Sequence, residues 1–188
     1  DDPWGLRHLG FWGGRGGSKT TVVARKLVKL VERSKRPLLV TAGREYMASI
    51  RESSHAAMKK AVAVVGTPSD WTLGEYQLTH RNGSRVIFIG MQNDAGSLDG
   101  IDVFWGDEAA FFSQGSLDRL IPTVRDAGSL CIWTWNPAEA TTPIETFLRC
   151  EEPPELSHVI GIQAHDNAYL YRTALHKIGR AHVRTPVT

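Results

Sequence analysis

Short apolar runs alternate with longer stretches of helical periodicity along the first third of the chain. The run at 9–12 leads into a glycine-rich segment, which interrupts a strand because glycine favours turns. After it, apolar residues recur at the three- and four-residue spacing of an amphipathic helix: Val22, Val23, Leu27, Leu30 and Val31. A second apolar run at 38–42 precedes a second helical stretch at 45–65. The order strand, helix, strand, helix predicts a parallel sheet.

The pattern changes around the dipeptide Asn82-Gly83, which is the strongest short signal for a hairpin turn. The segments 76–80 and 85–89 flank this dipeptide and are rich in residues that favour strands. We therefore expect an antiparallel hairpin inserted into the sheet at this point.

Two further apolar runs, at 101–105 and 130–135, have the length of buried central strands. The stretch between them carries Leu117, Leu120 and Ile121 at helical spacing. The fold class predicted from these patterns is α/β, with a mainly parallel central sheet flanked by helices and an inserted β-hairpin.

The composition is that of one ordinary folded domain. Hydrophobic residues at 41% and charged residues at 22% allow a real core to be buried. The net charge is only +2, so any polyanion must meet a local basic patch. The two cysteines, Cys131 and Cys150, lack metal-ligand spacing and favour a reduced, intracellular protein. No run approaches the roughly 20 apolar residues that span a bilayer, so no membrane partner is expected.

The glycine-rich segment has the residue types of a phosphate-binding loop. Such a loop needs glycines that let backbone N–H groups approach phosphates, a lysine for the outer phosphates and a hydroxyl for Mg²⁺. The segment consists of Gly13, Gly14, Arg15, Gly16, Gly17, Ser18, Lys19 and Thr20. Ser18 replaces the glycine of the consensus, which either disturbs the loop geometry or is tolerated as a small side chain. The alternative interpretation is a solvated glycine-rich turn.

Polar side chains follow the two later apolar runs. Asp107 and Glu108 come directly after the first run, where parallel sheets place their ligands. In a nucleotide hydrolase, Asp107 would hold Mg²⁺ and Glu108 would deprotonate the attacking water. Thr134 and Asn136 end the second run, where they could sense the γ-phosphate. The alternatives are a charge pair at a helix N-terminus and a strand that stops at an Asn-Pro turn.

Basic residues concentrate on and after the first predicted helix. They can contact phosphates without sequence specificity, or they can form a solvated helix face. The cluster consists of Lys26, Lys29, Arg33, Lys35 and Arg36. Arg44 and Arg51 are further candidates for contact with nucleotide or with a neighbouring subunit, or for simple solvation.

A series of motifs in a fixed order resembles the large terminase subunit of tailed bacteriophages. The series runs from Gly13 to Leu170 and so covers most of the chain. Its members are GGRGGSKT, Arg44-Glu45 with 49–53, the Asn-Gly-Ser hairpin, 100–102 leading into WGDEA, TWNP, and the segment 166–170.

This resemblance implies a P-loop ATPase of the additional-strand, RecA-like type that moves double-stranded DNA into a procapsid. By position in the motifs, Lys19 and Thr20 would bind phosphate and Mg²⁺, with Asp107 as the acidic metal residue. Glu108 would be the catalytic base, and Arg15 would lie near the γ-phosphate and offset charge in the transition state. Thr134 and Asn136 would form the coupling segment, and the cofactors would be ATP and Mg²⁺.

The same resemblance implies a homo-oligomeric ring, with double-stranded DNA, a portal protein and a small terminase subunit as partners. The expected location is the host cytoplasm and, transiently, the portal vertex of the procapsid. Two other functions remain open. One is a helicase or other RecA-like ATPase, and the other is a non-catalytic nucleotide-binding fragment.

The chain also departs from the family pattern, and the departures bear on its domain organisation. Ala168 stands where the family more often has proline. We expect 1–170 to be an ATPase domain that is incomplete at its N-terminus, with 151–155 as an exposed loop and 171–188 as a tail. Residues 178–188 resemble a translated sequencing adapter. The nuclease domain typical of terminases is expected to be absent, so DNA cleavage is not assigned to these residues.

Overall fold

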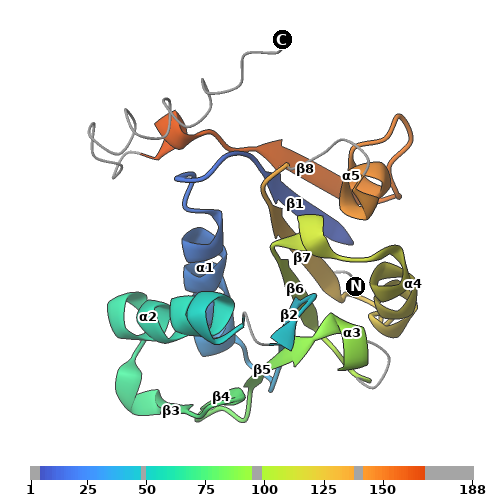
Figure 1. The fold of residues 1–188 in the computed structure, drawn as a ribbon. Coiled ribbons are helices and arrows are strands. Elements are labelled where there is room, and N and C mark those ends of the chain that lie inside the picture. Colours follow the sequence, from blue (N-terminus) through green and yellow to red (C-terminus); the bar gives the residue numbers. More distant parts are fainter. Residues whose placement is uncertain (1–4, 48–49, 95–98, 138–141, 168–188) are drawn as a thin grey trace.

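A computed structural model describes residues 5–47, 50–94, 99–137 and 142–167. Within them, the strands form one sheet that is covered by helices on both faces (Figure 1). The predicted α/β fold class is confirmed. No helix in these ranges is long and apolar enough to cross a membrane. The tail 171–188 lies outside the described residues.

The sheet is mainly parallel and carries an antiparallel margin. Its strand order is β3-β4-β5-β2-β6-β7-β1-β8, in which the pairs β3–β4 and β4–β5 are antiparallel and the remaining pairs are parallel. The strands are β1 (His8–Trp12), β2 (Leu39–Arg44), β3 (Trp71–Leu73), β4 (Gln77–His80), β5 (Arg85–Gly90), β6 (Val103–Asp107), β7 (Leu130–Trp135) and β8 (Ser157–Gly161). The runs predicted as central strands are indeed β6 and β7.

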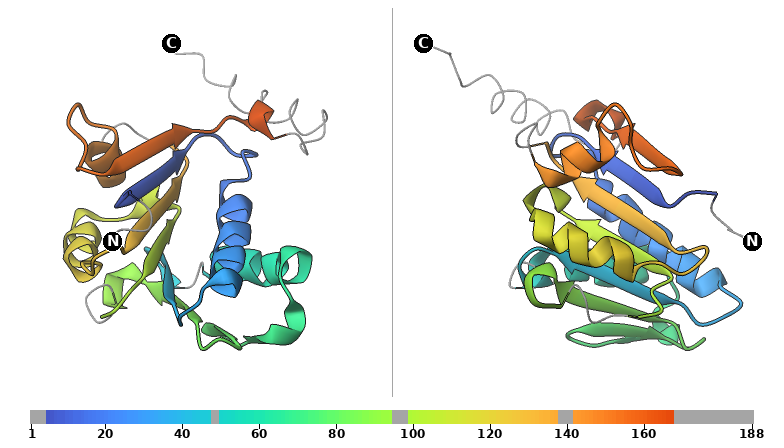
Figure 2. Two further views of the ribbon diagram at one scale, coloured as in Figure 1. Left: turned by 180° about the vertical axis from the view of Figure 1, so that it is seen from behind. Right: turned by 90° about the vertical axis from the view of Figure 1, so that its right-hand side faces the viewer.

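Helices cover the two faces of the sheet unequally, as Figure 2 shows from two further sides. One face carries α1 (Lys19–Arg33) and α2 (Ala56–Val65), and the other carries α3 (Met91–Asp94), α4 (Gln114–Thr123) and α5 (Pro143–Leu148). This three-layer arrangement buries apolar side chains on both sides of the strands, which therefore read as continuous apolar runs.

Strand β7 illustrates how one strand supplies both cores. Its alternate residues Leu130 and Ile132 pack into the cluster under α1 and α2, whereas Trp133 and Trp135 pack under α4 and α5. Side chains of a strand alternate between faces, so the period of two divides this run between the layers. Burial of a large side chain is worth about 1.5–3 kcal/mol, which makes this strand a main source of stability.

The predicted antiparallel hairpin is present and belongs to the main sheet. The turn at Asn82-Gly83 is present, with Gly83 at φ 88° and the Asn82 side chain donating to Val31 O of α1 at 2.9 Å. Strand β5, however, also pairs in parallel with β2, so the hairpin extends the sheet at this margin.

Three details differ from the sequence prediction. The helix expected from residue 45 is described from a π-helical turn, Arg51–His55, onward. Glu45 lies outside it, and its buried carboxylate accepts hydrogen bonds from Ser113 N and Ser116 Oγ at the start of α4. Strand β3 and strand β8 were not predicted as strands. Strand β3 has only three residues, and β8 is half exposed, so neither has a distinctive apolar pattern.

His8 is a buried titratable group at the start of β1. Its Nδ1 accepts a hydrogen bond from Trp133 Nε1 at 3.3 Å, and its ring packs edge-on against Phe147. Burial, assisted by the nearby positive charge of Arg7, lowers the pKa of His8 from 6.5 to about 4. The folded protein therefore holds this ring neutral, because a proton on Nδ1 would face the indole N–H.

We expect His8 to make the fold sensitive to acid. The unfolded chain binds a proton at His8 below pH 6.5, whereas the folded chain resists it down to about 4, so stability is lost as pH falls through this window. The loss between pH 7 and 4.5 should be roughly 2 kcal/mol for this group. Denaturant unfolding of the wild type and of His8→Gln, which keeps an acceptor but does not titrate, measures the difference. Equal acid sensitivity of the two proteins would contradict this account.

Candidate functional site

The glycine-rich loop connects β1 to α1 and lies against the chain that follows β8. Gly13 N donates to Trp135 O at 3.3 Å, and Ile162 N donates to Trp12 O at 2.7 Å. A side chain at Gly13 is excluded, since its Cβ would lie 1.8 Å from Ile162 O. The close approach of these backbones holds the loop at the carboxyl edge of the parallel strands, where such sheets bind ligands.

Ser18 occupies a position where the consensus has glycine. Its backbone conformation explains why glycine is preferred there. Its φ of 57° and ψ of 20° are left-handed, a conformation that costs most other residues about 1–2 kcal/mol. The chain therefore forms here, with a serine, a turn whose backbone conformation favours glycine. Asn167, which follows the 3₁₀ turn Ala164–Asp166, supports that turn by donating to Ser18 Oγ at 2.7 Å and to Gly16 O at 2.8 Å.

The Lys19 ammonium lies inside the loop. It donates to Gly13 O at 2.8 Å, to Gly14 O at 2.9 Å and to Asn136 Oδ1 at 2.8 Å. Burial lowers the pKa of Lys19 below its usual value, and the negative charge of Asp107 partly offsets that effect. A phosphate placed here would restore a full counter-charge to the ammonium.

Asp107 is the acceptor on which several elements converge. It ends β6 and is 1% exposed. Its Oδ1 accepts from Thr20 Oγ1 at 3.0 Å and from Thr134 Oγ1 at 2.9 Å, while its Oδ2 accepts from Ser53 Oγ. Residues from α1, β7 and the π-helical turn before α2 are thereby fixed to one carboxylate. A buried carboxylate requires such partners, because burying an unpaired charge is costly.

Glu108 is the more accessible of the two adjacent carboxylates. Its side chain is 51% exposed, and its φ of 54° is strained for a residue with a Cβ. The buried guanidinium of Arg44, at the end of β2, forms an ion pair with Glu108 Oε2 and lies 3.6 Å from Asp107 Oδ2. Arg44 therefore holds the two adjacent carboxylates in different roles, one buried and one accessible.

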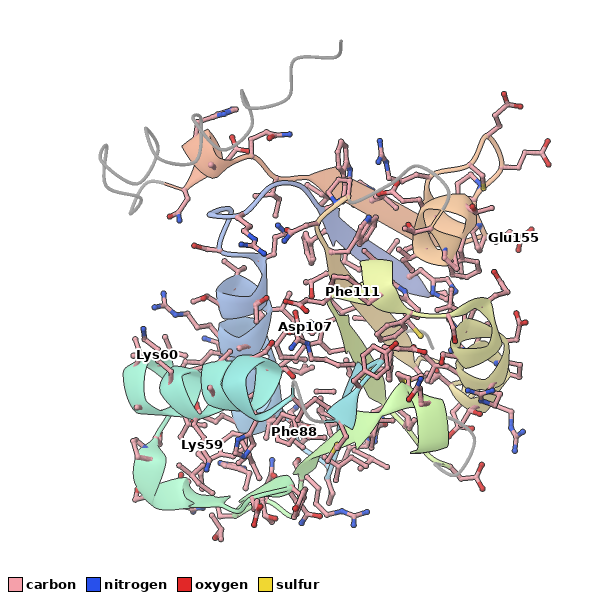
Figure 3. All side chains as sticks on the ribbon, in the orientation of Figure 1. Lys59, Lys60, Phe88, Asp107, Phe111 and Glu155 are labelled. Atoms are coloured by element: carbon pink, nitrogen blue, oxygen red, sulfur yellow. The ribbon has the colours of Figure 1, made fainter. Side chains whose placement is uncertain are left out.

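These residues surround a cavity of about 390 Å³. Figure 3 labels Asp107 in the middle of the molecule, beside the π-helical turn that precedes α2. The predicted residues in the cavity wall are Arg15, Gly16, Gly17, Ser18, Lys19, Thr20, Asp107, Glu108, Thr134 and Asn136. Arg15 is exposed at the rim, whereas Gly13 and Gly14 lie behind the wall and bind the Lys19 ammonium. The structure thus brings the predicted site residues together.

The donor set suits Mg²⁺, which prefers oxygen ligands and is often held by one or two protein groups plus phosphate oxygens. The hydroxyl of Thr20 and the carboxylate of Asp107 lie 3.0 Å apart on the cavity wall. No cluster of three or more His, Cys, Asp or Glu side chains suitable for a metal occurs within the described ranges. A site of this kind needs none, because the nucleotide supplies the other ligands.

Sequence reasoning assigned no role to Ser53 or Asn167, although both contact the site. Asn167 lay in the motif at 166–170, whose position in the series was the only signal. Ser53 lies in the segment 49–53, which belongs to the same series of motifs, so its only signal is likewise its position in that series. Arg44 was an ambiguous candidate, and the structure places it on the carboxylates. The side chain of Arg51 and residues 168–170 lie outside the described part of the chain.

Comparison with known proteins identifies the family to which the sequence belongs. The sequence model of the family described as phage terminase large subunit matches residues 8–179. The PBSX phage terminase large subunit of Bacillus subtilis (strain 168) is 32% identical over 126 residues, which are 65% of this chain and 29% of that protein.

Solved structures share the fold at low sequence identity. The large terminase of a thermophilic bacteriophage superposes with a TM-score of 0.78 at 12% identity, over 93% of this chain and 45% of the other. That terminase has also been solved in complex with ADP and with ATP-gamma-S. The large terminase ATPase domain of Thermus phage P74-26 gives 0.73 at 12% identity, over 95% of this chain and 84% of the other. The chain thus spans less than half of the PBSX protein and of the thermophilic-phage terminase.

We expect the backbone strain at Ser18 to be measurable. Ser18→Ala and Ser18→Gly both remove the hydroxyl that Asn167 contacts, but only glycine relieves the left-handed conformation. Ser18→Gly should therefore be more stable than Ser18→Ala by roughly 0.5–1 kcal/mol, after the larger unfolded-state entropy of glycine is taken into account. Equilibrium denaturant unfolding checks the order of the two variants. An alanine variant as stable as the glycine variant would show that the turn is not strained.

Proposed function

Since this chain belongs to the phage terminase large subunit family, we propose that it binds ATP in the 390 Å³ cavity and hydrolyses it to drive movement of double-stranded DNA into a procapsid. The observation that carries this proposal is the convergence of Lys19, Thr20, Asp107 and Glu108 on one cavity at the carboxyl edge of a parallel sheet. That combination suits a nucleoside triphosphate with Mg²⁺.

The loop and its lysine bind the phosphates. Backbone N–H groups of the loop lie at the N-terminus of α1, whose dipole favours anions. The Lys19 ammonium exchanges its bonds to Gly13 O and Gly14 O for the outer phosphate oxygens. Thr20 Oγ1 and Asp107 would hold Mg²⁺, which when bound neutralises charge that develops on the phosphates.

Glu108 acts as the general base. It is accessible to water at the cavity wall, and its carboxylate accepts a proton from the water that attacks the γ-phosphate. Arg44 is the positioning residue for this step, because it contacts both carboxylates and lies away from the phosphate loop. Arg15, exposed at the rim, is placed to offset negative charge on the γ-phosphate.

Asn136 links the nucleotide to the rest of the sheet. Its Oδ1 accepts from Lys19, and Thr134, two residues earlier on β7, donates to Asp107. When a phosphate binds the Lys19 ammonium, Asn136 Oδ1 loses its hydrogen-bond donor. The hydrogen bonds at the end of β7 therefore differ between the empty and the occupied site. This segment is the proposed coupling element.

The proposal extends to partners by family membership. The chain works in a homo-oligomeric ring with double-stranded DNA, a portal protein and a small terminase subunit, in the host cytoplasm and transiently at the portal vertex. The left-handed turn that Ser18 adopts supports nucleotide binding, and the accessible Glu108 carboxylate on the cavity wall supports hydrolysis over a non-catalytic nucleotide-binding fragment.

The central test is a pair of substitutions in the cavity. Lys19→Ala should abolish detectable ATP binding, because it removes the cation that meets the phosphates. Glu108→Gln should bind ATP as the wild type does but lower kcat by about 10²–10⁴-fold, since the amide cannot accept the proton. Binding is measured by titration with ATP-gamma-S, and turnover by phosphate release.

His8→Gln serves as the control, because His8 lies at the opposite end of β1 from the loop. Its turnover at pH 7.5 should match that of the wild type. Undiminished hydrolysis by Glu108→Gln would remove Glu108 as the base and overturn the mechanism. Unchanged nucleotide affinity of Lys19→Ala would move the site away from the glycine-rich loop.

Arg44→Gln tests the positioning role. We expect kcat to fall by about 10–100-fold with little change in KM for ATP, because the guanidinium touches the carboxylates and not the phosphate loop. Arg44→Lys should recover part of the loss by restoring the charge. A rise in KM with unchanged kcat would instead place Arg44 on the nucleotide.

A further inference from the structure

A groove lies on the outer side of α1, away from the nucleotide cavity. Its hollow of about 480 Å³ has an apolar floor formed by Val22, Leu30 and Val65. Arg25, Lys26 and Arg33 line the same hollow, and we call this surface the basic groove. Val22 is 45% exposed, so part of the floor is open to solvent.

Within the described residues, the positive charges of the basic groove are only partly paired with carboxylates. Lys29, which also lines it, pairs with Glu32 at 3.1 Å. Arg25, Lys26 and Arg33 have no carboxylate partner within the described ranges. The groove therefore presents an apolar floor bordered by positive charge. Phosphate groups would engage the charges but would leave the apolar floor unused, so an acidic segment with an apolar side chain fits better.

A loop with that chemistry is present in the same chain. Residues 151–156, which we call the acidic loop, carry Glu151, Glu152 and Glu155, all exposed, followed by Leu156. None of these glutamates has a cationic partner within the described part of the chain. Leu156 is 57% exposed, an unusual position for a large apolar side chain next to three acids.

The acidic loop is also held in shape. Leu156 has a left-handed φ of 58°, and its carbonyl accepts from Arg7 N at 2.8 Å and His8 N at 3.2 Å. Pro153 and Pro154 restrict the backbone between the glutamates. A preformed loop loses little entropy when it docks, which favours binding.

The basic groove and the acidic loop lie on opposite sides of the molecule. Figure 3 labels Glu155 at one side and Lys59 and Lys60, on the α2 side of the basic groove, at the other. One chain cannot bring its own two surfaces together, whereas a second copy can. Contact between different surfaces of identical chains is head-to-tail and builds a closed ring when the rotation closes.

We propose that the acidic loop of one copy docks into the basic groove of the next. Leu156 covers the apolar floor, and the glutamates meet Arg25, Lys26 and Arg33. This assignment rests on the ring assembly proposed above. Its test measures association and not hydrolysis, so the two proposals can fail separately.

Charge reversal on each surface provides the test. One variant carries Arg25→Glu, Lys26→Glu and Arg33→Glu, and the other carries Glu151→Lys, Glu152→Lys and Glu155→Lys. Sedimentation velocity over a concentration series should show self-association of each variant weakened at least about tenfold relative to the wild type, with the wild-type association itself weakened by salt. An equimolar mixture of the two variants should regain wild-type association, because each reversed surface then meets its complement.

Matched controls separate this interface from general charge effects. Arg81→Glu, Arg85→Glu and Arg125→Glu together reverse three charges outside the basic groove and should leave association unchanged. Leu156→Asn removes the apolar side chain but tolerates a left-handed backbone, so it should weaken association without unfolding the chain. Circular dichroism checks that every variant is folded.

When self-association is too weak for sedimentation to detect, a carbodiimide cross-linker can trap the complex, because it joins a lysine amine directly to a carboxylate. Mass spectrometry should identify Lys26 or Lys29 joined to a glutamate of the acidic loop in the dimer band. Failure of the mixture to recover association, or absence of both association and this cross-link in the wild type, would overturn the proposal. Loss of double-stranded DNA binding by the groove variant, with self-association intact, would overturn it in favour of a DNA-phosphate surface.

Discussion

The arrangement of the site depends on one buried carboxylate, that of Asp107. The β6 strand delivers it to the carboxyl edge of the sheet, and it is almost fully removed from solvent. Its two oxygens bind hydroxyl groups that come from the start of α1, the turn before α2 and the end of β7. A charge in this position is stable only with these partners, so the carboxylate and the elements around it fix one another.

The same network connects the glycine-rich loop to the neighbouring strand β7. Lys19 contacts both the loop carbonyls and Asn136, and Thr134 on the same strand contacts Asp107. A change at the loop therefore alters hydrogen bonds at the end of β7. On the other side of Asp107, Arg44 joins β2 to Glu108 and keeps the accessible carboxylate beside the buried one. Three strand ends thus share a single network.

The sequence predicted much of this arrangement, and the failures have physical causes. Apolar runs and the glycine-rich loop located β1, α1, β6 and β7, because β6 and β7 are buried along their whole length, glycine marks the turn after β1, and α1 has an amphipathic period. The short β3 and the half-exposed β8 escaped prediction, since little apolar surface distinguishes them. Ser53 and the contacts of Arg44 depend on tertiary packing, which places them beside Asp107 from distant parts of the chain. No local pattern contains that information.

The central claim is that Thr20 and Asp107 form a site for Mg²⁺ together with a nucleotide. The most direct measurement is the affinity for ATP-gamma-S with and without Mg²⁺, in the wild type and in Asp107→Asn, with folding checked by circular dichroism. The account predicts that Mg²⁺ tightens binding by the wild type about tenfold or more, equivalent to about 1.4 kcal/mol, and that Asp107→Asn loses this gain. An unchanged gain in Asp107→Asn would contradict the account and place the metal elsewhere.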